Sequence, residues 1–281
     1  MKTAELSDSL SSAATTQAAQ SPLRVLHRAN PLLSLTGWAN VALAVLALGL
    51  LPFDQRLVTG ALVWLKPLKF SLSVIAFTWT LGVLLADLPG SVQRSVRRLS
   101  LGVAMSMMVE QTIIFVQAAR GTTSHYNTSS LLDASLFEVM AVFIMLNTVM
   151  TIWALYLVWR HRPHGPAGYV WGVRLGLLLF IISSLLGSMM IHLNQHTVGA
   201  PDGGPGLPGL GWSTHAGDLR AAHFLGMHAL QAVPLLGWFL ARRMPRRAVL
   251  FTWLGAALYA GGVAGLFALA MAGRPLLVAG Y

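Results

Sequence analysis

Residues 168–193, GYVWGVRLGLLLFIISSLLGSMMIHL, contain one permanently charged side chain, that of Arg174. At roughly 1.5 Å per residue, a helix of this length can cross the hydrocarbon core of a bilayer, which is about 30 Å thick. A backbone in lipid has to satisfy its own hydrogen bonds, and barrel strands would be short and alternating. The stretch therefore predicts a membrane-spanning helix.

Six further apolar runs surround this one. Of the 281 residues, 55% are hydrophobic and 10% are charged, whereas a typical soluble domain has about a quarter charged residues. This composition excludes a disordered chain and predicts an all-α, polytopic membrane helix bundle of about seven transmembrane helices, one domain over residues 31–275. The predicted spans are residues 32–52, 61–86, 100–119, 133–159, 168–193, 219–241 and 248–272.

The ends and the charges of the chain predict its orientation. Residues 1–30 are rich in Ser, Ala, Thr and Gln, so we expect a mobile cytoplasmic tail there. With the N-terminus inside, thirteen of the nineteen Lys and Arg residues face the cytoplasm. This asymmetry predicts a multi-pass membrane protein with its N-terminus in the cytoplasm. It also accounts for the net charge of +10 without a nucleic-acid partner.

Histidines gather on the predicted outer side, which holds six of the nine. His192 and His196 form an HxxxH pair, which on a helix leaves one face and is a common metal-ligand spacing. His223 and His228 begin the sixth span. Their five-residue spacing turns the two rings in different directions. His125 lies in the outer loop 119–130.

Two carboxylates lie inside predicted spans, where an ionisable group is a functional candidate. For Glu110 and Glu138 we consider proton transfer. The alternative for Glu110 is a structural helix contact, because Gln117 and Arg120 continue its stripe. The alternative for Glu138 is a structural ion pair with a lysine of the second span, Lys66 or Lys69.

Residues 198–218 connect the fifth and sixth spans and are dense in Gly and Pro. Such a segment is too constrained for a helix and too apolar for a plain linker, so we expect an ordered outer loop that caps the bundle. Asp202 is expected to shape a turn. Asp218 is expected to cap the N-terminus of the sixth helix.

Four runs resemble a family of bacterial multi-pass integral membrane proteins. They are LKPLKFSLS (65–73), QAARGTTSHYN (117–127), HTVGAPDGGPGLP (196–208) and GWSTHAGDLRAAHFLGMHALQ (211–231). The resemblance implies a multi-pass protein of the bacterial inner membrane whose signature lies on the outer face. It implies no particular reaction.

The outer histidines favour a membrane redox protein that binds b-type haem. Helix bundles hold haem between facing helices through histidine pairs. The candidate ligands to the haem iron or to a metal ion are His125, His192, His196, His223 and His228. The basic residues that could pair with haem propionates are Arg120, Arg220, Lys66 and Lys69. Electrons would come from quinol or from a periplasmic partner. Because the chain has no cysteine, covalent haem attachment, iron–sulfur clusters and disulfides are excluded.

Two other functions stay open. The first is a non-haem enzyme that binds Zn, Fe or Cu through His192, His196, His223 and His228 and acts at the outer leaflet. The second is a proton-coupled transporter or pH sensor, in which Glu110 carries the proton. The apolar spans themselves make the lipid bilayer a partner in all three cases.

Overall fold

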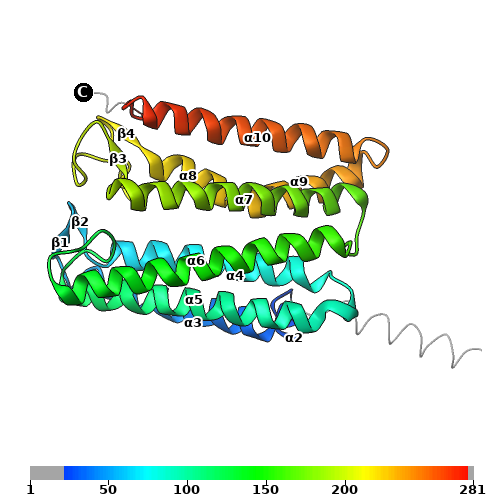
Figure 1. Cartoon of the computed structure of the whole chain (residues 1–281), viewed down its shortest axis with the longest axis horizontal. Helices are drawn as coiled ribbons and strands as arrows, with labels where there is room; N and C mark the ends of the chain where they lie inside the picture. Colours follow the sequence, from blue (N-terminus) through cyan, green and yellow to red (C-terminus); the bar gives the residue numbers. More distant parts are fainter. Residues whose placement is uncertain (1–21, 278–281) are drawn as a thin grey trace, which may run out of the picture.

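The computed structural model describes residues 22–277, which fold mainly into helices (Figure 1). Within this range, six helices are long and apolar enough to cross a membrane, and a seventh span results if the bent pair α8–α9 is counted as one. The helices suit a multi-pass membrane protein. They are α2 (Pro22–Ala29), α3 (Pro31–Leu50), α4 (Leu65–Ala86), the short 3₁₀ turn η1 (Gly90–Val92), α5 (Gln93–Arg120), α6 (Leu131–Arg160), α7 (Ala167–Leu193), α8 (Leu219–Met227), α9 (Ala229–Arg243) and α10 (Ala248–Met271).

Three predicted boundaries differ from these helices. The second span begins at Leu65 instead of residue 61, because β1 (Leu57–Val58) and β2 (Ala61–Leu62) pair as an antiparallel hairpin. The third begins at Gln93, since its first two turns are helical although they are polar. Residues 22–29 of the predicted mobile tail form the helix α2. Residues 1–21 of that tail lie outside the described part.

The helices form two groups (Figure 1). One group contains α2 to α6 and the other α7 to α10, and they touch through α6 with α7 and through α4 with both α7 and α9. Loops 51–64, 121–130 and 194–218 lie at one end of the bundle, which we call the loop end. Loops 87–92, 161–166 and 244–247 lie at the other, which we call the arginine end.

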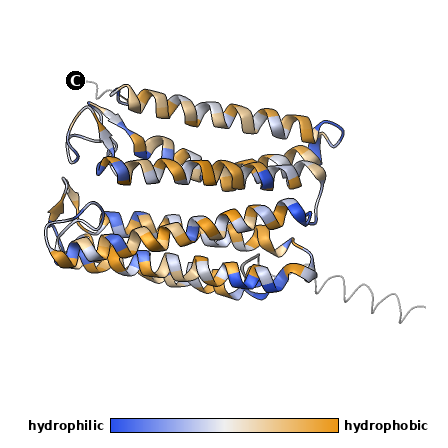
Figure 2. Cartoon of the chain, viewed as in Figure 1, coloured by the Kyte–Doolittle hydropathy of each residue, from blue (hydrophilic) through white to orange (hydrophobic). Residues whose placement is uncertain are grey.

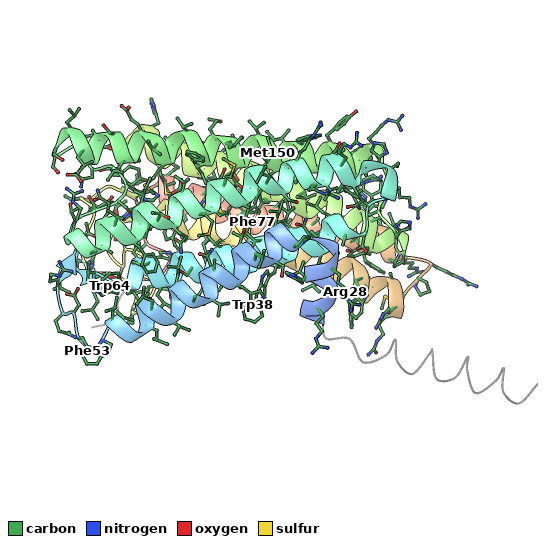
Figure 3. The ribbon with its side chains drawn as sticks, turned by 90° about the horizontal axis from the view of Figure 1, so that it is seen from below. Arg28, Trp38, Phe53, Trp64, Phe77 and Met150 are labelled. Carbon is green, nitrogen blue, oxygen red and sulfur yellow. The ribbon has the colours of Figure 1, made fainter. Side chains whose placement is uncertain are left out.

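Apolar side chains join the two groups in the middle of the bundle. The rings of Phe77 on α4 and Phe180 on α7 stack with centroids 5.0 Å apart, and Phe77 lies in the interior in Figure 3. Leu81, Val173 and Leu230 belong to the same buried cluster. Hydrophobic residues also cover the outer faces of the helices (Figure 2), as on α10, where the side chain of Leu258 is 80% exposed. A helix that is apolar on its exposed face suits contact with lipid.

Helices α7 and α9 approach each other along a seam of glycines. A Cβ added to Gly168, Gly172 or Gly176 would lie 2.7–2.9 Å from a backbone oxygen of α9. The spacing of four keeps the three on one face, as in the small-residue motifs that let membrane helices pack closely.

The sixth predicted span is broken at His228. There α8 and α9 meet at an angle of 41°. The loop before α8 is tied to the end of α7 by strands β3 (Thr197–Val198) and β4 (Gly217–Asp218), which pair antiparallel.

Candidate functional site at the loop end

Polar side chains from both helix groups gather at the loop end, and we call them the loop-end cluster. Lys66 of α4 interacts electrostatically with Glu110 of α5 and with Arg220 of α8. The positive charges of Arg220 and Lys66 also lower the pKa of His196, which follows α7. The cluster thus combines side chains far apart in sequence: Lys66, Lys69, Glu110, His125, His196, Asp202, Asp218 and Arg220.

Lys66 and His125 form the centre of the cluster. Lys66 enters at the first turn of α4, and its Nζ lies 3.2 Å from Nδ1 of His125. The Ser124 hydroxyl also lies 3.1 Å from Nδ1. An ammonium group has only protons to donate, so Nδ1 accepts and the ring proton is on Nε2.

The surroundings of His125 keep its ring neutral. Phe70, Tyr126 and Phe137 contact the imidazole with ring centroids 5.7–6.4 Å away. Burial, together with the nearby charge of Lys66, lowers the pKa of His125 well below 6.5. A neutral imidazole can therefore accept from Lys66 across the physiological pH range. Burial also raises the pKa of Tyr126 to about 12, and the carboxylate of Asp202 acts in the same direction.

Glu110 lies deeper, near the middle of α5, and its residue is 6% exposed. It interacts electrostatically with Lys66. Within residues 22–277 its carboxyl group makes neither a hydrogen bond nor an ion pair. The predicted stripe with Gln117 and Arg120 is therefore not a single network.

His196 and Asp202 form a second pair at the loop end. Nδ1 of His196 lies 3.1 Å from Oδ1 of Asp202. The same carboxylate accepts the backbone N–H of Thr197 at 2.9 Å and that of His196 at 3.3 Å. Asp202 therefore shapes the turn after α7, as its position in the sequence predicts. It also holds the imidazole with its proton on Nδ1, leaving Nε2 as an acceptor.

The state of His196 predicts a pH effect on stability. Burial and the charge of Arg220 lower its pKa to about 4, outweighing Asp202. The unfolded chain takes up this proton near pH 6.5, so the folded state loses stability as pH falls from about 6.5 to about 4, by about 3 kcal/mol in all. We expect the melting temperature in detergent to drop more steeply over this range in the wild type than in His196→Gln. Melting temperatures that fall in parallel for the two proteins would contradict this prediction.

Arg220 and Asp218 organise the Gly/Pro-rich loop. Asp218 accepts the backbone N–H of Arg220 at 3.0 Å and so caps α8, as predicted. It also accepts the N–H of Ser213 at 2.8 Å and pairs with the guanidinium of Arg220 at 2.6 Å. Arg220 donates to the carbonyl of Gly211 as well. Lys69 of α4 reaches the same loop at the carbonyl of Leu210, 3.2 Å away.

The prediction that His192 and His196 share one helix face is wrong. Helix α7 ends at Leu193, and Asn194 adopts the left-handed conformation with φ 54°. The chain turns there, so His196 lies off the helix beside Asp202, while His192 is exposed on its last turn. The signal was present in the sequence, since Asn is one of the residues that often close a helix in this conformation.

The other two predicted histidines lie deeper in the bundle. His223 packs between α7 and α8, and its Nδ1 donates to the carbonyl of Ser183 at 2.8 Å. Gly187 makes room for the ring, because a Cβ there would lie 3.0 Å from Cε1 of His223. His228 sits at the break between α8 and α9 with its ring 4.4 Å from that of Phe224. The histidines thus occupy several separate places.

Two other candidates also differ from expectation. Glu138 is exposed on the outer face of α6, and it pairs with neither Lys66 nor Lys69. Arg120 donates to Asp133 at 2.5 Å and to the side-chain oxygen of Gln117. Asp133 also accepts from Gln117 at 2.8 Å. These bonds tie the end of α5 to the start of α6, which is a structural role for Arg120.

The part of the chain that the structure describes contains no second candidate site with the geometry of a metal centre. No three side chains of His, Asp or Glu gather there as a ligand set. The chain matches no family model, no curated protein and no solved structure. What the loop-end cluster does is therefore inferred from its own chemistry.

Proposed function

We propose that the chain is a multi-pass protein of the bacterial plasma membrane that transports a small anion together with a proton. In this proposal the N-terminus and the arginine end face the cytoplasm, and the loop end faces outward. One observation carries it. Lys66 is partly buried, its ammonium donates to a neutral histidine, and no carboxylate of residues 22–277 lies within 4.0 Å of its Nζ.

The charges of the cluster favour an anion as the substrate. Asp218 is occupied by Arg220, and Asp202 by His196 and two backbone N–H groups. Lys69 donates only to a carbonyl. Lys69 interacts electrostatically with Asp218, which Arg220 already engages, so the otherwise unengaged carboxylate near Lys66 is that of Glu110. A partly buried cation without a close counter-ion is costly, and a bound carboxylate or phosphate would supply one.

The same arrangement links anion binding to proton uptake. Glu110 is the carboxyl group whose charge acts on Lys66. An anion that binds beside Lys66 puts a second negative charge near Glu110, which favours its protonated form. Anion and proton then help each other to bind, and linkage makes this effect reciprocal.

Transport, as opposed to binding alone, is favoured by the helix arrangement. The loop-end cluster lies where two helix groups meet, with few elements in contact between them. The pair α8–α9, counted as one span, is bent by 41° at His228. Secondary transporters commonly use discontinuous helices beside their substrate site and rock one bundle against another.

A proton-influx assay tests the proposal. Purified protein is reconstituted into vesicles that enclose a pH-sensitive dye. Inward gradients of poorly permeant anions (inorganic phosphate, gluconate, succinate) are then applied one at a time. We expect at least one anion to acidify the lumen, with no such change in protein-free vesicles or with a chloride gradient of equal strength. Equal traces with and without protein for anions of all three kinds would sink the proposal.

A haem redox function is the second candidate, and one observation favours it. Because Nδ1 of His223 donates to the Ser183 carbonyl, its Nε2 keeps a lone pair that a haem iron could take. His125 is less suited, since Lys66 occupies Nδ1 and the ring proton is on Nε2. We expect a haem protein to show a Soret band that shifts on dithionite reduction and is lost in His223→Ala. Colourless protein from cells supplied with haem would end this candidate.

A further inference from the structure

We propose that a groove at the arginine end holds one acyl chain of an anionic membrane phospholipid, whose phosphate is bound at Arg242. The groove lies between α4 and α9, at the opposite end from the loop-end cluster, and the inference does not depend on the transport function. Its volume of about 640 Å³ lies within the usual range for ligand sites.

The walls of the groove are apolar and open to the membrane. Val83 of α4 and Leu235 and Trp238 of α9 line it, and their side chains are 48%, 63% and 41% exposed. Pro234 and Leu84 complete the apolar lining. Thr80 and Gln231, which bond to each other across the groove at 3.2 Å, bring α4 and α9 together. A slot with this lining suits a hydrocarbon chain.

The cation that marks the headgroup position is Arg242. It follows Trp238 by four residues, so it continues the groove face of α9 by one turn toward the helix end. Its guanidinium lies 3.8 Å from the centroid of the Trp238 ring. It makes no ion pair with a carboxylate of residues 22–277. A guanidinium held in this way can bond a phosphate through two parallel N–H groups.

The surrounding charge favours an anionic over a zwitterionic lipid. Arg243, Arg246 and Arg247 follow on the same stretch of chain, and Arg24 of α2 lies exposed at this end. Leu26 of α2 itself lines the groove. The one carboxylate in the lining is that of Asp87, which accepts the Tyr169 hydroxyl at 2.5 Å. An amine-bearing headgroup would face several arginines, whereas phosphatidylglycerol carries only the negative charge.

Native mass spectrometry of the whole protein in detergent tests this inference. Phosphatidylglycerol and phosphatidylcholine with identical acyl chains are added separately. The wild type should bind phosphatidylglycerol more tightly. Arg242→Gln should weaken that binding roughly tenfold, the effect of one charge-assisted hydrogen bond. It should weaken phosphatidylcholine binding less, because the choline cation already opposes binding beside the arginines. Arg243→Gln is the matched control, because Arg243 stacks on Phe239, outside the groove lining.

A blocked groove separates a chain in the groove from lipid held on the surface by charge. Val83→Trp should fill the slot and weaken binding of both lipids, and Leu235→Trp serves if the first variant fails to fold by its melting curve. The proposal is overturned if the wild type binds the two lipids equally. It is also overturned if Arg242→Gln and Arg243→Gln behave alike, or if the folded groove variants bind as the wild type does.

Discussion

Gly172→Leu is expected to destabilise the folded protein by more than about 3 kcal/mol, beyond the usual cost of overpacking a core. A Cβ at Gly172 would lie 2.7 Å from the carbonyl oxygen of Val233 and 2.8 Å from the Cα of Pro234. Both are backbone atoms of α9, so no side-chain rotation relieves the clash. Gly168 and Gly176 make similar approaches to α9 one turn away on either side. The whole helix would have to move away from α7.

Gly261→Leu is the matched control for this prediction. It lies on α10, where a Cβ would meet nothing within 4 Å, and leucine is the better helix former by roughly 0.5–1 kcal/mol. Thermal unfolding in detergent, followed by tryptophan fluorescence, should show a large drop in melting temperature for Gly172→Leu and none for Gly261→Leu. Equal melting temperatures for the two variants would show that the seam contributes nothing particular.

Hydropathy predicted most of the helices because lipid-facing and buried positions are both apolar, so a span reads as one continuous run. Its failures have physical causes. Residues 57–62 are apolar but form a hairpin, and the first turns of α5 are polar but helical. The break at His228 depends on how α8 and α9 pack on α7, which no local pattern records. The glycine seam was not predicted, although Gly168, Gly172 and Gly176 have the four-residue spacing typical of closely packed membrane helices.

The topology predicted from the sequence puts several members of the loop-end cluster at one end of the bundle, but it does not predict their contacts. Helix periodicity relates residues on one helix, so it cannot indicate that Lys66 meets His125, 59 positions along the chain. It also assumed that the helix continues to His196, although Asn194 ends it first. Asp202 and Asp218 were correct because turns and caps are local. Glu110 was singled out by its depth in a span, but its electrostatic partner came only from the three-dimensional structure.

Glu110→Gln and Lys66→Met are expected to fail in different ways if anion and proton move together. The amide in Glu110→Gln cannot take up the proton, so anion-driven acidification should stop, while exchange of labelled for unlabelled anion continues. Lys66→Met removes the cation that the anion pairs with, so both the acidification rate and the anion-exchange rate should fall by about 100-fold or more. The reason is that losing one partner of a buried ion pair costs about 3–5 kcal/mol. Glu138→Gln is the matched control, because that carboxylate is exposed on α6 and lies outside the cluster. Full acidification in Glu110→Gln would place the proton elsewhere, and unchanged exchange in Lys66→Met would remove Lys66 from the anion site.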